Sequence, residues 1–301
     1  MARKKRKILA FRANTIAPQP ESAQPYSQFA RVYDHCMEHV PYAGWADYLL
    51  DVSRRWFGRV PEQVLDLACG TGHLLQYLYR RVRHCAGMDL SIEMLHRARQ
   101  RLPRVSWLQG RLEGPLPYED SSQPWVVCSH DSINYLTDLG QLESHFQEVA
   151  RILQPGGLYC TDIVSLNNIL RNFDRQTTED HLEGTVLVWS NAYNQEKRLM
   201  YSWLEFDRLD GSPIVREEHI QRFHTPDELG RCARNAGLHL FAHEGDFSRH
   251  VARKADNLWN FHFVKPDTNG RVVPGTHNIQ QTKRPANPLD GAPEPGAQVR
   301  L

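Results

Sequence analysis

The chain has 301 residues, of which 41% are hydrophobic, and its formal net charge is +1 at pH 7. This length and apolar content are enough to bury one large core and a modest appendage. A net charge so close to zero provides no global field for nucleic acid, and no apolar run approaches the roughly 20 residues that span a bilayer. We therefore expect a compact enzyme or binding protein with no membrane partner, and nucleic acid is disfavoured.

The six cysteines are scattered along the sequence, without a C-x-x-C pair. Several lie inside apolar runs, which is typical of small buried side chains in a reducing compartment. No Cys/His cluster has the spacing of metal ligands, so the sequence predicts no metal site. We expect a cytoplasmic location.

Residues 1–24 begin with the basic run Arg3-Lys4-Lys5-Arg6-Lys7 and continue with Pro, Gln and Ser. A segment of this composition buries too little apolar surface to fold, so we expect a disordered basic tail. The basic run could instead contact RNA, an anionic surface or an import receptor. No apolar segment follows it, which excludes a secretory signal.

Two aromatic-rich segments follow the tail. Residues 26–34 carry Tyr26 and Tyr33 at helical spacing, and Pro41 opens a second helix with an apolar stripe over residues 42–52. The two tyrosines either face a bound cation, which attracts aromatic rings by about 0.5–2 kcal/mol, or cover the edge of a sheet. Both interpretations remain open.

The stretch VLDLACGTGHL at residues 64–74 is the most informative part of the chain. It predicts a buried parallel strand containing Asp66, a tight turn with Gly70 and Gly72, and the start of a helix. The glycines allow the backbone to approach a ligand closely. A second apolar run ends at Asp89, where a carboxylate can accept from both hydroxyls of a ribose. Together they predict a nucleoside-containing cofactor on a doubly wound α/β sheet.

The glycine spacing separates two classes of cofactor. A dinucleotide fingerprint needs a third small residue, and Leu75 stands at that position. The chain also lacks the G-x-x-x-x-G-K-[ST] pattern of a phosphate loop. A dehydrogenase is therefore disfavoured.

The remaining elements alternate between strands and helices. Ser91 is a candidate N-cap for a helix, and Thr225 with Pro226 is another. We expect strands at residues 105–110, 125–129 and 158–163, a helix at 139–153, and a final antiparallel pair at 238–242 and 258–264. Residues 185–189, 198–206 and 214–220 predict a three-stranded antiparallel meander, because turn residues separate them. Residues 165–184 are polar and compatible with a helix, and residues 266–301 predict a second disordered tail.

These segments resemble the class I S-adenosylmethionine-dependent methyltransferases. The resemblance rests on D-x-x-x-G-x-G at residues 66–72, on D-L-S-I-E-M-L at 89–95, and on L-x-P-G-G before the fifth strand. It implies that Asp66 lies near the methionine amino group, Asp89 at the ribose and Met94 against adenine. The cofactor residues implied in this way are Tyr26, Tyr33, Asp66, Gly70, Gly72, Asp89, Leu90, Met94, Arg111, Leu112, Ser129 and His130. Arg111 departs from the family, which commonly has an acid there for the adenine amine.

Three further segments are similar to a bacterial subgroup of small-molecule N- or O-methyltransferases: P-Y-x-x-W, D-S-I-N-Y-L, and E-E-H-x-Q-R-x-x-T-P-x-E-L. The resemblance spans residues 26–265. It implies a doubly wound, mostly parallel seven-stranded Rossmann-like sheet with an N-terminal helical lid and a small antiparallel β insertion. The methyltransferase domain would comprise residues 25–164 and 223–265, and residues 165–222 would form an inserted substrate cap.

Methyl transfer is an in-line displacement, so catalysis depends largely on positioning. An amine acceptor needs only deprotonation, whereas a hydroxyl needs a general base. The catalytic candidates are Asp131, Asn134 and His219. For Asp131 the alternative is capping of the following turn, and for His219 it is packing on the meander. His130, Tyr135, Glu218 and Arg222 are further candidates for the same cleft.

We therefore expect a methyltransferase that uses S-adenosyl-L-methionine and a small-molecule acceptor. The absence of D/N-P-P-Y/F after the fourth strand counts against methylation of adenine amino groups or glutamine. The alternatives are a methyltransferase acting on RNA or protein, and a non-catalytic S-adenosylmethionine-binding protein. The acceptor atom and the oligomeric state do not follow from the sequence.

Overall fold

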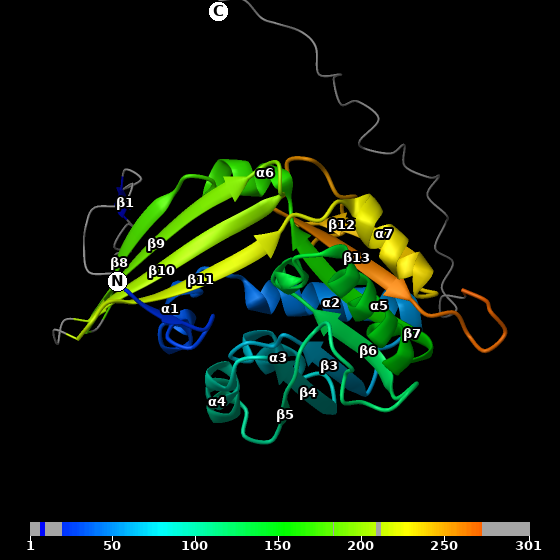
Figure 1. Cartoon of the computed structure of the whole chain (residues 1–301). Helices are drawn as coiled ribbons and strands as arrows, with labels where there is room; N and C mark the ends of the chain where they lie inside the picture. Colours follow the sequence, from blue (N-terminus) through cyan, green and yellow to red (C-terminus); the bar gives the residue numbers. More distant parts are fainter. Residues whose placement is uncertain (1–6, 10–19, 183, 209–211, 273–301) are drawn as a thin grey trace, which may run out of the picture.

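The computed structural model describes residues 7–9, 20–182, 184–208 and 212–272, and within them the chain forms two β-sheets (Figure 1). We call the seven-stranded sheet, with strand order β12-β13-β7-β6-β3-β4-β5, the core sheet. The six-stranded sheet, with order β1-β8-β9-β10-β11-β2, is called the second sheet. Among the described residues, no helix is both long and apolar enough to cross a membrane.

The core sheet is parallel over five strands and antiparallel at one edge. The parallel strands are β3 (Gln63–Leu67), β4 (His84–Asp89), β5 (Ser106–Gln109), β6 (Gln123–Cys128) and β7 (Leu153–Val164). The antiparallel edge consists of β12 (His239–Gly245) and β13 (Leu258–Val264). This arrangement confirms the predicted seven-stranded, mostly parallel sheet.

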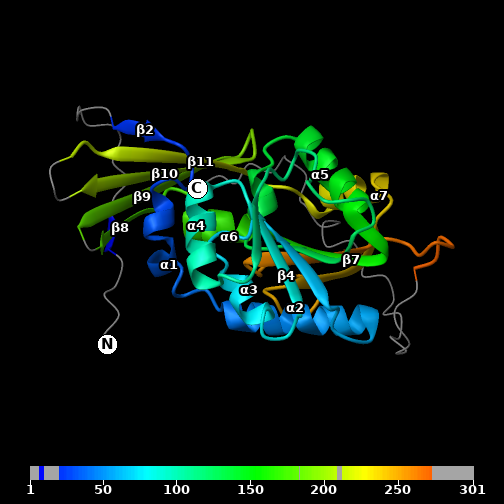
Figure 2. The ribbon, with the colours of Figure 1, turned by 90° about the horizontal axis from the view of Figure 1, so that it is seen from below.

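Helices cover both faces of the core sheet (Figure 2). On one face lie α2 (Tyr42–Phe57), α3 (His73–Leu78) and α4 (Ile92–Arg101), and on the other lie α5 (Leu139–Ile152) and α7 (Pro226–Asn235). Successive strand residues point to opposite faces, so Val64 packs with α2 and α3 while Leu65 and Leu67 pack with α5 and α7. The apolar residues on both faces of β3 thus reflect burial of both faces of the sheet.

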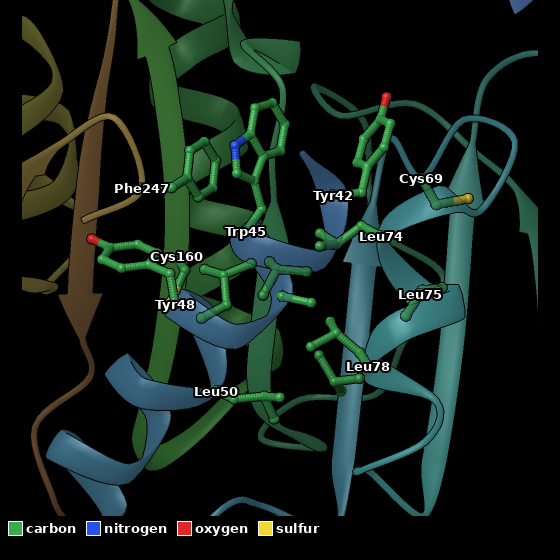
Figure 3. Close-up of a cluster of buried hydrophobic side chains, with 14 of the residues drawn as sticks. Tyr42, Trp45, Tyr48, Leu50, Cys69, Leu74, Leu75, Leu78, Cys160 and Phe247 are labelled. Atoms are coloured by element: carbon green, nitrogen blue, oxygen red, sulfur yellow. The ribbon is translucent and has the colours of Figure 1, made fainter. Parts of the chain in front are cut away.

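The aromatic stripe of α2 forms the centre of one core cluster (Figure 3). Trp45 stacks on Phe247 with ring centroids 4.1 Å apart, and Tyr48 meets the same phenylalanine edge-on at 5.7 Å. Cys160 of β7 belongs to this cluster, and none of the six cysteines forms a disulfide. The stripe therefore anchors α2 on the sheet.

Two helix starts lie where the sequence placed them. The Ser91 hydroxyl accepts from the Met94 amide at 3.2 Å, and the Thr225 hydroxyl accepts from the Glu228 amide at 3.2 Å. Pro226 occupies the first helical position after Thr225. The predicted caps of α4 and α7 are confirmed.

The second sheet is larger than the predicted three-stranded meander. It contains β8 (Thr177–Leu182), β9 (Thr185–Asn194), β10 (Leu199–Arg208) and β11 (Val215–Arg222), joined antiparallel in chain order. Residues 165–184 were compatible with a helix, but among those that the structure describes helices cover only α6 (Leu166–Asn168) and the π-helix η3 (Ile169–Phe173). The sequence of β8, Thr-Thr-Glu-Asp-His-Leu, has no apolar pattern that would predict a strand. Backbone pairing with β9 stabilises this strand and does not require such a pattern.

Two short strands from the first 24 residues extend the second sheet. β1 (Lys7–Leu9) pairs with β8, and β2 (Glu21–Ala23) pairs in parallel with β11. The expectation of disorder is therefore corrected for residues 7–9 and 21–23, because backbone pairing with a distant strand leaves no trace in composition. Arg3, Lys4, Lys5 and Arg6 lie outside the described residues, as do residues 273–301 of the second predicted tail.

After β2 the chain forms a short helical turn, Phe29–Arg31, and then α1 (Tyr33–Cys36). Figure 1 shows α1 between the second sheet and helices α3 and α4. Phe29 packs edge-on against Trp189 of β9, with ring centroids 5.3 Å apart. Residues 20–42, which we call the N-terminal segment, thus join the two sheets.

Candidate active site

A cavity of about 990 Å³ lies between the carboxyl ends of the core-sheet strands and one face of the second sheet. The carboxyl ends are where ligands bind in open α/β sheets. The N-terminal segment covers this cavity, contributing Tyr26, Phe29, Tyr33 and Tyr42 to its wall. Its volume lies at the upper end of the range typical of ligand sites, about 300–1,000 Å³.

Of the two glycines in the loop after β3, one lines the cavity and the other does not. Gly70 lines the cavity with φ of 55°, and its amide donates to the Asp89 carboxylate at 2.8 Å. Gly72 does not line it, and a Cβ there would lie 2.9 Å from the indole of Trp107. The expected ligand contact is therefore corrected for Gly72, whose φ of 77° and packing on β5 explain the glycine.

Asp66 is a buried carboxylate without a partner of its own. Its side chain is only 2% exposed and lines the cavity, and no hydrogen-bond donor of the described chain reaches it. Burial, together with the charge of Asp89, raises the pKa of Asp66 well above its usual value. An unpaired buried carboxylate of this kind fits an ammonium group of a ligand.

Asp89 is held by backbone groups on both of its oxygens. Oδ2 accepts from the Gly70 amide at 2.8 Å and Oδ1 from the Ser91 amide at 2.9 Å. Burial raises the pKa of Asp89, although these hydrogen bonds oppose the shift. Each carboxylate oxygen keeps a second lone pair, so the pair of oxygens can still accept from two neighbouring hydroxyls.

Apolar side chains line the cavity beside Asp89. Leu90 is 54% exposed, which is unusual for leucine, and Met94 and Leu112 lie in the same wall. Arg111 also lines the cavity, but its guanidinium pairs with Glu113 at 3.1 Å. An ammonium site, a diol site and an apolar wall match the amino acid, ribose and adenine groups of S-adenosylmethionine, so the residues present fit this cofactor.

The turn after β6 is held in an unusual backbone conformation. His130 and Asp131 have φ values of 65° and 50°, in the left-handed region that non-glycine residues rarely adopt. Their amides donate to the two oxygens of Asp162, at 2.9 and 2.7 Å, and Asp162 is fully buried. Asp162 was not predicted as a site residue, because nothing in the fifth strand marks it. This carboxylate fixes the two residues that line the cavity beside Ser129.

The Asp131 side chain faces the second sheet. It makes no cap to the following turn, and its Oδ2 accepts from the Gln221 side chain of β11 at 3.3 Å. Burial raises the pKa of Asp131 to about 7, although the Gln221 contact opposes the shift. The alternative capping role is therefore corrected, and the carboxylate titrates near neutral pH.

His130 lies among tyrosines. Its Nδ1 is 3.2 Å from the Tyr42 hydroxyl and 3.3 Å from the Tyr33 hydroxyl. Burial, together with the electrostatic effect of nearby His39 and His73, lowers the pKa of His130 to about 4. Its imidazole is therefore neutral at pH 7.

Asn134 does not reach the cavity. It is fully buried, its Nδ2 donates to the Arg222 carbonyl at 2.7 Å, and its Oδ1 accepts from the Val164 amide at 3.2 Å. Asn134 thus joins β7 to β11 by hydrogen bonds, and it does not have the catalytic role that we expected. The Arg222 side chain pairs with Glu228 at 3.0 Å and likewise lies outside the cavity wall.

His219 of β11 belongs to a buried chain of hydrogen bonds. The Tyr26 hydroxyl is 2.7 Å from the Tyr135 hydroxyl, which is 2.9 Å from His219 Nδ1. His219 Nε2 is 3.1 Å from Glu217 Oε2. Tyr26, Tyr135 and His219 all line the cavity, so this chain connects its two walls.

Glu217 was missed by sequence reasoning. It is fully buried and accepts from the Tyr26 amide at 2.8 Å and the Phe29 amide at 3.0 Å, as well as from the Gln28 amide. We instead considered Glu218, which is exposed and bonds to Trp203. The period of a strand could have shown that Glu217 shares a face with His219.

Asp34 ties α1 to the glycine loop. It accepts from the Thr71 hydroxyl at 2.7 Å and from the Arg101 guanidinium at 2.6 Å, and it lies 3.2 Å from His73 Nε2. Sequence reasoning missed these contacts, because the partners lie 37 or more residues away. Within the described ranges, no group of three or more His, Cys, Asp or Glu side chains could hold a metal ion.

Comparisons with known proteins agree with this geometry. Residues 64–157 match the family described as "Methyltransferase domain". The chain is 30% identical over 228 residues to the "Putative methyltransferase YqeM" of Bacillus subtilis (strain 168), which covers 74% of this chain and 90% of that protein.

Two solved structures share the fold. One is an S-adenosylmethionine-dependent methyltransferase from Clostridium acetobutylicum, with a TM-score of 0.67 and 22% identity over 80% of this chain and 99% of that chain. The other is the sugar N-methyltransferase KedS8 from Streptoalloteichus, with a TM-score of 0.62 and 20% identity over 86% and 99%. With the sequence match to YqeM, these findings show that the chain belongs to the class I S-adenosylmethionine-dependent methyltransferases.

Proposed function

We propose that this enzyme methylates a nitrogen or oxygen atom of a small molecule. The observation that carries the proposal is the single cavity in which Asp66 and Asp89 share a space with one face of the second sheet. A cavity covered by the N-terminal segment suits a compact acceptor better than a polymer. The description of KedS8 as a sugar N-methyltransferase supports the same class of acceptor.

S-Adenosylmethionine supplies the electrophilic methyl group when it is bound. We propose that Asp66 binds its ammonium group, that Asp89 binds its ribose, and that apolar residues enclose its adenine. The proposed cofactor residues that line the cavity are Tyr26, Tyr33, Asp66, Gly70, Asp89, Leu90, Met94, Arg111, Leu112, Ser129 and His130.

The acceptor would lie between Asp131 and the second sheet. Asp131 and His219 are the groups that we propose to hold the proton that the acceptor loses. The aromatic residues of the N-terminal segment would exclude water and hold the acceptor in line, and positioning of this kind supplies several kcal/mol of rate acceleration.

Calorimetric titration tests the cofactor part of this proposal. S-Adenosylmethionine and S-adenosylhomocysteine should bind with dissociation constants of about micromolar, roughly 8 kcal/mol, and NAD should not bind. Binding of NAD alone would contradict it. Transfer of a radiolabelled methyl group to the low-molecular-mass fraction of a cell extract then tests the acceptor class, with the high-molecular-mass fraction as the comparison.

Methylation of RNA or protein would require a surface for a polymer, and the basic run is its candidate. Deletion of residues 1–24 would also remove β2 and part of the cavity wall, including Ala23 and Gln24. Deletion of residues 1–6 is the sharper experiment. We expect it to leave transfer to small molecules intact, whereas loss of all transfer would favour a polymer. We also propose a cytoplasmic location, consistent with six cysteines that form no disulfide in the structure.

A further inference from the structure

The part of the cavity beside the second sheet combines apolar and aromatic side chains with three polar ones, Ser202, His219 and Gln221. Trp189, Met200 and Leu204 contribute from β9 and β10, and Phe173 contributes from η3. Tyr26 and Phe29 face them from the N-terminal segment. This wall fits an acceptor whose body is aromatic or aliphatic, because such a body loses little on leaving water.

The charged groups around the cavity are mostly negative. The described residues that line it include five carboxylates, Asp66, Asp89, Glu93, Glu113 and Asp131, against one guanidinium and no lysine. The guanidinium belongs to Arg111, which pairs with Glu113 on the loop after β5. An anionic acceptor would therefore find no free cation in this wall, and burial of an unpaired anion is costly.

Asp131 is the carboxylate that meets the second sheet. It contacts Gln221, and its charge contributes to the raised pKa values of the Tyr26, Tyr33 and Tyr135 hydroxyls, after burial of each ring. Asp131 thus contacts Gln221, lies within electrostatic range of three tyrosine hydroxyls, and lines the same cavity as these tyrosines. Carboxylates and aromatic rings are the two groups that bind ammonium ions best.

The backbone of Asp131 is held firmly in place. Its amide donates to Asp162 at 2.7 Å, and the His130 amide donates to the same carboxylate. These two hydrogen bonds hold Asp131 in its left-handed conformation. An aspartate whose backbone is fixed in this way is partly preorganised for a ligand, which reduces the entropic cost of binding.

We propose that the acceptor is an amine on an aromatic or aliphatic body without an anionic group, and that Asp131 binds its amino group. This inference rests on the proposed methyl transfer and specifies its substrate class. It excludes phosphorylated, nucleotide-linked and carboxylate-bearing acceptors. Asp131 acts as the specificity-determining residue, and Gln221 orients its carboxylate.

Three probes that share a phenyl ring and differ in the polar group test this inference. The enzyme, saturated with S-adenosylhomocysteine, is titrated with 2-phenylethylamine, 2-phenylethanol and phenylacetate. We expect the amine to bind at least about tenfold more tightly than phenylacetate, with the alcohol between them. In Asp131→Asn the amine should lose about tenfold in affinity while the affinity for the alcohol changes less than about twofold.

Asp227→Asn is the matched control, because Asp227 is exposed at the start of α7, outside the cavity wall. It should preserve the preference for the amine. Thermal melting of both variants checks that they are folded. Phenylacetate binding as tightly as the amine, an Asp131→Asn variant that keeps the preference, or no amine binding at millimolar concentration would each overturn the inference.

Methyl-transfer assays with different acceptors separate an error in the proposed substrate class from an error in the proposed function. Methyl transfer to a small alcohol or acid, with none to amines, would leave the proposed function standing and overturn the inference. Transfer only to macromolecules would overturn the proposed function, and the three-probe titration would then decide the amine preference by itself.

Discussion

The two sides of the cavity are built in different ways. On the core-sheet side, each site residue lies within a few positions of a strand end, and the contacts that fix it join the ends of neighbouring strands, as in the bond from the Gly70 amide to Asp89, 19 residues along the chain. On the second-sheet side, the decisive contacts join segments far apart in the chain. Glu217 binds amides about 190 residues away, and Tyr135 bonds to Tyr26 across 109 residues.

This difference separates the general part of the chemistry from the specific part. The core-sheet side holds carboxylates and glycines whose positions follow from strand-turn-helix geometry, and it fits the cofactor of the family. The second sheet adds the wall that an acceptor would meet. Changes on the core-sheet side should therefore affect cofactor binding, and changes on the second-sheet side should affect the attachment of the N-terminal segment.

The largest expected effect is at Glu217, on the second-sheet side. Glu217→Ala leaves three backbone amides and His219 without their buried acceptor, so the free energy of unfolding should fall by about 3–5 kcal/mol. Urea unfolding measures the change. Glu218→Ala, at the exposed neighbour, should cost less than about 1 kcal/mol. Equal losses in the two variants would show that Glu217 does not hold the N-terminal segment.

On the core-sheet side, Asp89→Ala should weaken binding of S-adenosylmethionine about a hundredfold, or about 3 kcal/mol, because charge-assisted hydrogen bonds are lost. Calorimetry measures the dissociation constant. Asp47→Ala, at an exposed position of α2, is the control and should bind normally. An unchanged affinity in Asp89→Ala would remove Asp89 from the cofactor site.

Acid should destabilise the core-sheet side before the second sheet. Burial lowers the pKa of His145 on α5 to about 4. Below the usual histidine pKa of about 6.5 the unfolded state binds a proton that the folded state excludes, so stability falls as pH drops from there toward 4. The pKa of Glu217 is lowered, since its hydrogen bonds from His219 and from backbone amides outweigh the opposing effect of burial. Its contribution therefore persists until the pH falls below about 4.5.

The measurement is urea unfolding at pH 7.5 and pH 5. His145 alone should contribute about 2 kcal/mol to the loss, so we expect the loss to be smaller by about this amount in His145→Gln, since the glutamine side chain does not titrate. His35→Gln is the control, because His35 is exposed. A loss of the same size in His145→Gln and in the unmodified protein would assign the acid sensitivity to other groups.

The smallest effect is expected at Asp34, which joins the N-terminal segment to the glycine loop. Asp34→Asn keeps the shape but weakens the pairing with Arg101, so S-adenosylmethionine should bind about fivefold more weakly, or about 1 kcal/mol. Hydrogen exchange should become faster in α1. Glu38→Gln serves as the control, because Glu38 is exposed and pairs only with His35 in the described chain. Unchanged exchange in α1 would contradict the proposed link.

Much of the core sheet could be predicted from sequence, because its signals are local. Alternation of apolar runs, the glycine spacing and the caps at Ser91 and Thr225 determine strands, turns and helix starts within windows of a few residues. The same reasoning placed Asp66 and Asp89 on the cavity. It failed for Gly72, whose glycine is required by the contact with Trp107, a residue of a different strand.

The second sheet was harder to predict, because its stability depends on pairing between distant segments. The polar strand β8 and the short strands β1 and β2 carry no apolar periodicity, and their partners are known only from the fold. Glu217 was missed for the same reason, and so was Asp162 of the core sheet, since each binds amides of another segment. Asn134 was assigned to catalysis because its motif neighbours Asp131 and Tyr135, which do line the cavity.

A crystal structure with S-adenosylhomocysteine tests the division of the cavity most directly. We predict that the ligand lies on the core-sheet side, with its ammonium group at Asp66 and its ribose at Asp89, and that the space between Asp131 and the second sheet stays open for an acceptor. A ligand that fills the space against Trp189 and Met200, or that leaves Asp66 without a partner, would contradict it.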